Sequence, residues 1–251
     1  MKIVKKILLT IITSIIILGI GPVTSKASLI AYFPFEGNAN DATGNGYDGT
    51  VNGATLTTQG HSGKAYNFDG NDYIYVSLNI NPSKMPTLTM GAWVKATDGT
   101  PTKQIISHDN GGYDRSLGID YRGDSTGWSA FSGSGNVLGA YPVILNSWAF
   151  VAVVYDQNAQ KVTLYVNGNT MSKSGILENG YTFLRIGSNP GFGEYFEGTI
   201  DDVFFYDEAL TTAQLDNIMT NGVSPVPLPS SFVLLLTSIL GFYGLRKFRC
   251  G

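Results

Sequence analysis

The sequence has very little cysteine and, over most of its length, little positive charge. Its one thiol, Cys250, is the second-last of 251 residues, so no disulfide forms within the chain. A fold without disulfides relies on its core, or on a metal ion, for stability. Residues 28–224 carry nine basic against 19 acidic side chains, a net charge of −10. Such a surface repels phosphate backbones, so we expect no nucleic-acid partner.

The residues that commonly assemble a catalytic site are also scarce. His61 and His108 are the only histidines, and both lie in polar segments where we expect solvated loop residues. Retaining glucanases need two carboxylates about 5–5.5 Å apart, commonly from one strand. None of the glutamates before residue 200 has an acidic residue two positions downstream. The sequence therefore predicts a protein without enzymatic activity.

The first 27 residues have the pattern of a secretory signal peptide. Three lysines precede an apolar run over residues 7–21, and Ser25 and Ala27 supply the small residues of a cleavage site. A run of about 15 residues is short for a membrane span. We therefore predict export with cleavage after Ala27, with an uncleaved N-terminal anchor as the alternative.

The C-terminal segment, residues 224–251, contains a second hydrophobic signal. The motif Val226-Pro227-Leu228-Pro229 precedes an apolar stretch over residues 232–245, and a basic cluster over residues 246–249 follows. Basic residues stay on the cytoplasmic side of a transmembrane segment, which would leave residues 28–223 outside the membrane. The two ends of the chain thus predict the same topology.

This order of motif, apolar span and basic end resembles the PEP-CTERM sorting signal of Gram-negative bacteria, in a variant with Leu228 where the common motif has Glu. The resemblance implies transient anchoring through residues 232–245, then processing by an exosortase-type membrane enzyme near Val226, Pro227, Leu228 and Pro229. The product would be a cell-surface or extracellular protein. Proteins sorted in this way tend to accompany exopolysaccharide production, which implies extracellular polysaccharide as a partner. A permanent C-terminal anchor is the alternative.

Residues 28–223 have the length of one domain. Short alternating or apolar runs between glycine-rich turns predict an all-β fold, a two-sheet antiparallel sandwich. The run over 148–156 is apolar on both faces, which places it at the centre of the sandwich. One helix is predicted near the end, with Thr211 and Gln214 as a capping box and Gly222 as its stop. The expected strands are 29–35, 65–68, 73–77, 88–95, 104–107, 117–121, 128–131, 148–156, 161–167, 183–186 and 199–206.

Several of these blocks resemble, in order, the laminin-G-like jelly-roll domains of the concanavalin A-like lectin/glucanase superfamily. They include Gly63–Tyr73, Leu164–Gly168 and Phe196–Val203, and the resemblance spans residues 29–222. It implies a jelly-roll sandwich with a short C-terminal helix.

Calcium prefers hard oxygen ligands. The sequence offers them in a glycine-rich loop near residue 45 and in two consecutive aspartates, Asp201 and Asp202, at the start of the last strand. In the resembled family this loop and the last strand often share a calcium ion. The resemblance implies Asp41, Asp201 and the backbone carbonyl of Gly46 as ligands. Asp202 is a further member, although strand alternation turns it away from Asp201. The ion would be structural, and the alternative is metal-free turn chemistry, in which Asp and Asn cap their own backbone.

Aromatic and arginine side chains gather among glycines and serines between residues 108 and 141. This mixture is suited to stacking on sugar rings and to hydrogen bonding with hydroxyls. The candidate glycan contacts are Tyr113, Arg115, Trp128 and Tyr141. Trp128 lies in an alternating stretch that is more typical of a core, so the loop-borne Tyr113 and Tyr141 are favoured.

The sequence thus predicts an exported, non-catalytic protein for adhesion or for contact with extracellular polysaccharide. Two alternatives from other classes stay open. One is a glycan-cleaving enzyme with an unrecognised carboxylate pair, for which Glu194 and Glu197 are the residues to substitute. The other is a purely structural coat protein.

Overall fold

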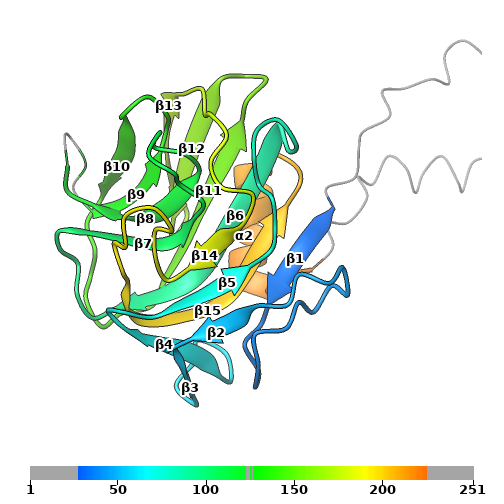
Figure 1. Cartoon of the computed structure of the whole chain (residues 1–251), viewed down its shortest axis with the longest axis vertical. Coiled ribbons are helices and arrows are strands. Elements are labelled where there is room, and N and C mark those ends of the chain that lie inside the picture. Colours follow the sequence, from blue (N-terminus) through cyan, green and yellow to red (C-terminus); the bar gives the residue numbers. More distant parts are fainter. Residues whose placement is uncertain (1–27, 123–124, 126, 225–251) are drawn as a thin grey trace, which may run out of the picture. The chain divides into compact units, whose positions relative to one another are not determined.

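The computed structural model describes residues 28–122, 125 and 127–224. The predicted signal peptide with Ala27, the processing motif Val226–Pro229 and the apolar segment 232–245 lie outside these residues. The described part folds as two antiparallel β-sheets packed face to face, the all-β jelly-roll sandwich that the sequence predicts (Figure 1). Within it, no helix is long and apolar enough to cross a membrane.

Sheet A has eight strands in the described residues, in the order β13-β12-β11-β6-β15-β4-β3, and β1 pairs with β15 beside this path. The first and last strands of the domain are therefore neighbours. Its strands are β1 (Leu29–Phe33), β3 (Thr55–Thr57), β4 (Ala65–Asp69), β6 (Thr87–Ala96), β11 (Ala149–Asp156), β12 (Lys161–Val166), β13 (Asn169–Ser174) and β15 (Glu197–Tyr206).

Sheet B has seven strands in the described residues, in the order β10-β9-β8-β7-β14-β5-β2. Its strands are β2 (Thr50–Asn52), β5 (Tyr73–Val76), β7 (Thr102–Ser107), β8 (Ser116–Asp120), β9 (Gly127–Phe131), β10 (Val137–Tyr141) and β14 (Leu184–Ile186). In Figure 1 strands of this sheet lie in front, with β14 and β5 near the middle of the view.

The core lies between the sheets because alternate side chains of each strand point inward. On β5, Ile74 and Val76 are fully buried while Tyr73 and Tyr75 are half-buried on the opposite face. On β14, Leu184 and Ile186 are buried on either side of the half-buried Arg185. The outer face of sheet B is therefore partly polar and aromatic.

The helix α2 (Thr212–Asn221) packs on the outer face of sheet A. Thr211 and Gln214 form the predicted capping box, and Gly222 is the C-cap. Leu215 and Ile218 join a second apolar cluster with Phe150 of β11. This cluster explains why seven of the eight residues of β11 are buried, since the helix covers one face and the sandwich core covers the other.

The two described ends of the chain meet at the end of β15. The backbone of Ser28 exchanges hydrogen bonds with Asp207, at 2.8 Å to its carboxylate and 3.2 Å from its amide. The Tyr206 hydroxyl donates to the carbonyl of Ser224 at 2.5 Å. Residues 28 and 224 thus flank the same pair of residues.

All eleven expected strands are confirmed, with ends shifted by a few residues. Strands β2, β3, β10 and β13 were not predicted. Two of them are three residues long, and every residue of β13 is exposed, so neither length nor alternation marks them.

Candidate functional site

The predicted calcium ligand Asp41 is buried and organises its own loop. Its carboxylate accepts hydrogen bonds from the amides of Tyr32 and Thr43, at 3.1 and 3.0 Å, and from the Thr43 hydroxyl at 2.8 Å. The amide of Tyr47 is 3.4 Å from its second oxygen. Gly46 has a φ of +85°, which a glycine adopts without strain in this turn. The chain's own donors thus already occupy most acceptor positions of Asp41.

The other two predicted ligands lie on a bulge of β15. Asp201 is buried, and its carboxylate accepts the amides of His61 and Ser62 at 2.9 and 3.1 Å and that of Asp202 at 2.8 Å. Burial raises the pKa of Asp201 to about 7. Asp202 has a φ of +49° and accepts the Tyr32 hydroxyl at 2.5 Å.

Tyr32 therefore contacts both predicted parts of the calcium site, through its amide at Asp41 and through its hydroxyl at Asp202. Among the described residues, no three His, Cys, Asp or Glu side chains are grouped closely enough to hold a metal ion. A calcium ion at these carboxylates would have to displace hydrogen bonds that the chain makes by itself. Calcium binding stays a prediction.

Two of the four predicted glycan contacts, Arg115 and Trp128, are wrong because their side chains are buried. The Arg115 guanidinium donates to the carbonyls of Ile80 and Met85, each at 2.7 Å, and lies 5.3 Å from the Tyr155 ring. Trp128 is 2% exposed and belongs to the core between the sheets. A ligand therefore reaches neither side chain.

The other two, Tyr113 and Tyr141, are half-buried. The Tyr113 ring lies 4.9 Å from that of Phe131, and the Arg122 guanidinium lies 5.4 Å from the Tyr113 ring. Tyr141 pairs with Trp128 at the end of β10 and packs against the core. Both residues pack against neighbouring side chains. Neither contacts the loop around Asp41 and Gly46.

His108 is not the solvated loop residue that the sequence suggests, since it is fully buried. Its Nε2 accepts the Arg115 amide at 3.1 Å, so the proton of the neutral ring is on Nδ1, which donates to the Tyr181 carbonyl at 3.1 Å. Burial lowers the pKa of His108 to about 4. This histidine is fixed in one neutral tautomer and supports the loop at residue 181.

The carboxylates that might have formed a glucanase pair are engaged in other contacts. The Glu194 carboxylate accepts hydrogen bonds from the side-chain amides of Asn189 and Gln104, at 3.0 and 3.1 Å. It also forms an ion pair with Arg122 at 3.2 Å. The same Asn189 amide donates to the buried Asp109 at 3.0 Å. Glu197 pairs with Lys103 at 3.0 Å. The contacts of Glu194 fasten the loop over residues 188–194, and both glutamates are engaged with neighbouring side chains.

One hydrolase-like motif was overlooked in the sequence. Residues 123–127 read Gly-Asp-Ser-Thr-Gly, the spacing of a nucleophile turn. Ser125 is 3% exposed, and its hydroxyl donates to the Asp120 carbonyl at 2.7 Å. Strand β9 begins at Gly127, where a hydrolase would have a helix. Ser125 is therefore a structural residue.

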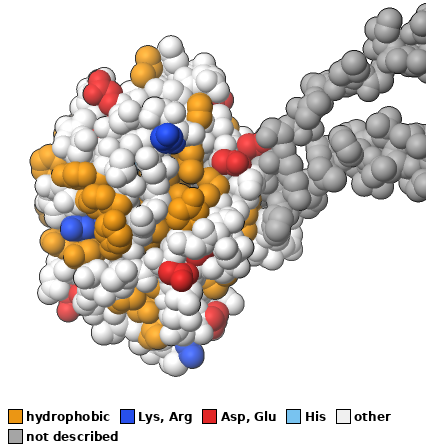
Figure 2. All heavy atoms as spheres, turned by 45° about the vertical axis from the view of Figure 1, so that its right-hand side comes forward, with side chains coloured by type: hydrophobic (Ala, Val, Ile, Leu, Met, Phe, Trp, Pro, Cys, Tyr) orange, Lys and Arg blue, Asp and Glu red, His pale blue; other side chains and the backbone are white. Residues whose placement is uncertain are grey.

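The outer face of sheet B carries a row of aromatic rings that is open to solvent. The Phe183 ring lies 5.1 Å from that of Tyr75 and 5.0 Å from that of Tyr181, with interplanar angles of 34° and 28°. Tyr73 lies on the same face of β5 as Tyr75. We call these four residues, with Arg185, the open face. Figure 2 shows hydrophobic side chains gathered in a band on the surface with few charges among them.

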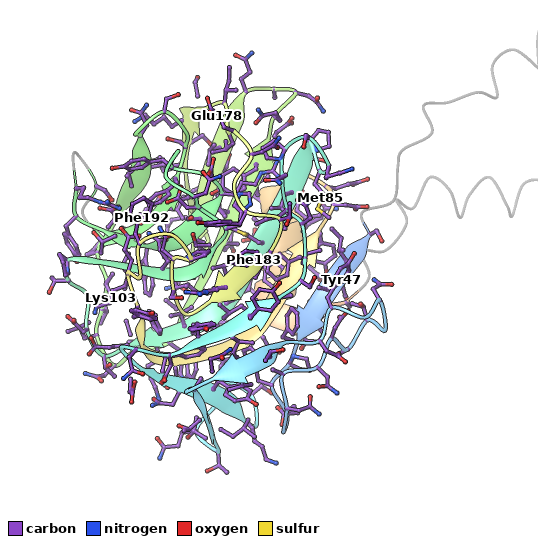
Figure 3. The ribbon with its side chains drawn as sticks, viewed as in Figure 1. Tyr47, Met85, Lys103, Glu178, Phe183 and Phe192 are labelled. Carbon is purple, nitrogen blue, oxygen red and sulfur yellow. The ribbon has the colours of Figure 1, made fainter. Side chains whose placement is uncertain are left out.

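Figure 3 places Phe183 over the middle of sheet B, with Phe192 to one side and Met85 and Tyr47 to the other. Phe192 is 61% exposed and stands on the loop that Asn189 fastens to Asp109. This loop thus presents a further exposed ring outside the strands of sheet B.

The tyrosines of the open face differ from four other tyrosines of the domain in the use of their hydroxyls. Tyr32, Tyr155, Tyr165 and Tyr206 each donate theirs to a protein group. In the part of the chain that the structure describes, the hydroxyls of Tyr73, Tyr75 and Tyr181 have no such partner. The open face thus combines ring surface with hydroxyls that are left to solvent or a ligand.

A second aromatic group on sheet A is less suited to a ligand. The His61 ring stacks on Trp93 at 3.6 Å, and the Lys95 ammonium lies 5.1 Å from the Trp148 ring. Each of these tryptophans already has a face covered by the chain itself. Ligand contact would first require moving His61 or Lys95.

Two packed antiparallel sheets, one of them with an aromatic outer face, define a lectin-like β-sandwich. Residues 68–216 match the Laminin_G_3 model of the concanavalin A-like lectin/glucanases superfamily, and the chain belongs to this family. A search of curated proteins by sequence found no match.

Several solved structures share the fold. Domain 4 of AbnA, an extracellular arabinanase from Geobacillus stearothermophilus, solved with arabinotriose, is 21% identical with a TM-score of 0.63, covering 77% of this chain and 99% of that domain. The binding domain of Paraclostridial Mosquitocidal Protein 1 is 17% identical with a TM-score of 0.59, and that of botulinum neurotoxin serotype D is 19% identical with a TM-score of 0.58. These matches cover 77% and 78% of this chain and 52% of each toxin chain.

Proposed function

We propose that the protein is an exported, non-catalytic module that binds extracellular polysaccharide through the open face of sheet B. The row of Tyr75, Phe183 and Tyr181 carries this proposal, because sugar rings pack their apolar C–H faces against aromatic rings. The unpartnered tyrosine hydroxyls add hydrogen bonds to sugar hydroxyls.

Two further observations support a binding role. The arabinanase domain with the same fold was solved with arabinotriose, and the toxin relatives are binding domains. In addition, Glu194 and Glu197 are tied to neighbouring side chains, so the residues considered for glycan cleavage act in the structure as loop contacts. We expect no release of reducing sugar from any glycan that the protein binds.

Loss of the aromatic rings should weaken glycan binding. We expect Tyr75→Ala and Tyr181→Ala each to reduce affinity roughly three- to tenfold, because one stacked ring contributes about 0.5–1.5 kcal/mol. The ligand would be chosen on a glycan array and its affinity measured by calorimetry. Met171→Ala, an exposed position on β13 of sheet A, is the control and should bind as the unchanged protein does. Equal affinities for all three variants would remove the open face from the proposal.

We also propose a structural calcium ion held by Asp41, Gly46 and Asp201, with Asp202 beside them. A ligand that binds only the folded state raises its stability. Chelation with EDTA should therefore lower the melting temperature by several degrees, and added calcium should restore it while magnesium does not. Asp41→Asn should abolish the calcium response, and Asp156→Asn should retain it. Identical melting curves with and without calcium would contradict the proposed calcium ion.

We further propose that export and exosortase-type processing deliver this domain to the surface of a Gram-negative cell, after transient membrane anchoring through residues 232–245. The mature protein should then lack residues 1–27 and the sequence that follows Pro229. Intact mass spectrometry of the protein recovered from the cell surface or medium would measure both ends. A mass that includes the apolar tail would indicate permanent anchoring instead.

A further inference from the structure

Arg185 stands in the middle of the open face. In the strand register it lies between Tyr75 of β5 and Ser107 of β7, and it is half-buried. Its guanidinium carbon is 3.9 Å from the centre of the Tyr73 ring, which places the charged group over that ring. A cation is thus fixed among the aromatic side chains that we propose as the glycan contact.

The other two arginines of the described residues use their terminal N–H groups within the protein, although the Nε of Arg115 is also buried without an acceptor. Arg115 donates to the carbonyls of Ile80 and Met85, and Arg122 pairs with Asp120 and Glu194 at 2.7 and 3.2 Å. Within residues 28–224, as far as the structure describes them, Arg185 has neither a carboxylate partner nor a hydrogen bond, and its Nε is buried without an acceptor.

Arg185 is half-buried and its terminal N–H groups, unlike its Nε, are not among the buried unpartnered atoms, so these groups are the donors that a ligand could reach. Because arginine presents a planar fork of N–H groups, it matches the two oxygens of a carboxylate or sulfate better than it matches a single hydroxyl.

We propose that the open face is selective for anionic glycans, with Arg185 binding a carboxylate or sulfate group while Tyr75 and Phe183 pack against the sugar rings. This inference rests on the proposed glycan-binding function and adds the class of ligand. It also gives the domain a local attraction for acidic polysaccharide that its net charge of −10 does not provide.

The test compares matched oligosaccharides on one array: neutral, uronate-containing and sulfated members, together with the methyl esters of the uronates, which keep the ring and lose the charge. We expect the strongest ligands to be anionic. Arg185→Gln should weaken them at least tenfold, and Arg185→Lys should restore only part of the affinity, since a charge-assisted bidentate contact contributes about twice a neutral one. Lys161→Gln on β12 makes the same change of charge on the other sheet and should bind normally.

The outcomes separate this inference from the proposed function. Preference for uronates over sulfated members, or the reverse, identifies the anionic group. Tight binding of neutral or methyl-esterified glycans that Arg185→Gln leaves unchanged would overturn the anionic selectivity and keep the glycan-binding function. Absence of binding to every member by a protein with a cooperative melting transition would overturn both. The melting temperatures of the variants verify that each one is folded.

Discussion

Replacing Arg115 with methionine should lower the free energy of unfolding by about 3–4 kcal/mol. Its guanidinium is the donor for the carbonyls of Ile80 and Met85, each at 2.7 Å, and the side chain is fully buried. Methionine keeps much of the volume but leaves both acceptors without a donor, and each such group costs about 1–3 kcal/mol. Urea unfolding followed by tryptophan fluorescence measures the change.

The size of this effect is not obvious, because burying a charge is itself costly. Burial lowers the pKa of Arg115 to about 10, and a well-packed apolar residue sometimes replaces a buried ion without loss. Here the partners are backbone carbonyls that remain in place after the substitution, so the penalty is not removed with the charge. Lys161→Met, at an exposed position of β12, should change stability by less than about 0.5 kcal/mol. A loss below 1 kcal/mol for Arg115→Met would show that water reaches the two carbonyls.

Acidification from pH 6.5 to 4 should remove about 3 kcal/mol of the stability that depends on His108. The unfolded histidine has an ordinary pKa near 6.5, whereas burial lowers the pKa of His108 to about 4. Between pH 6.5 and pH 4 the unfolded state therefore binds a proton that the folded state does not bind. The contribution is complete above pH 6.5 and is lost as pH falls to 4, at about 1.4 kcal/mol per pKa unit.

Asp114 and Asp201, whose pKa values burial raises to about 6 and about 7, titrate in the opposite direction and mask much of this slope. Each of these carboxyls costs stability at neutral pH, and the cost disappears toward pH 3.8. The comparison that isolates His108 is the unchanged protein against His108→Asn, which retains both carboxyls. The variant should be less stable at pH 7 and show a flatter pH dependence, while His61→Asn should keep most of the original slope. Parallel curves for His108→Asn and the unchanged protein would contradict the neutral, buried histidine.

The architecture was predictable because most strands bury one face. On β5 the order Tyr-Ile-Tyr-Val separates a core face from an outer face, and the capping residues Thr211 and Gln214 mark the helix directly. The strand β13 has no such pattern, since all six of its residues are exposed at the edge of sheet A and it is held there by pairing with β12. Pairing of this kind depends on a neighbour that local sequence does not reveal.

The candidate site was less predictable, because composition does not tell which way a side chain points. Arg115 and Trp128 have the residue types of a glycan site, yet one supports backbone carbonyls and the other fills the core. The pattern that would have indicated the open face is the alternation of apolar residues with tyrosine or arginine along the predicted strands. Tyr73 and Tyr75 alternate with buried Ile74, and Arg185 stands between two buried residues, so both predicted strands place their exposed residues on one surface. Only the pairing of β14 with β5 shows that these surfaces join.

The meeting of Ser28 and Ser224 beside Tyr206 and Asp207 has a consequence for how this domain combines with other sequences. The two described ends of the domain lie close together, so the domain is suited to insertion into a loop of a host protein. Both described ends lie beside the end of β15, a strand of sheet A, whereas the aromatic surface is built on strands of sheet B.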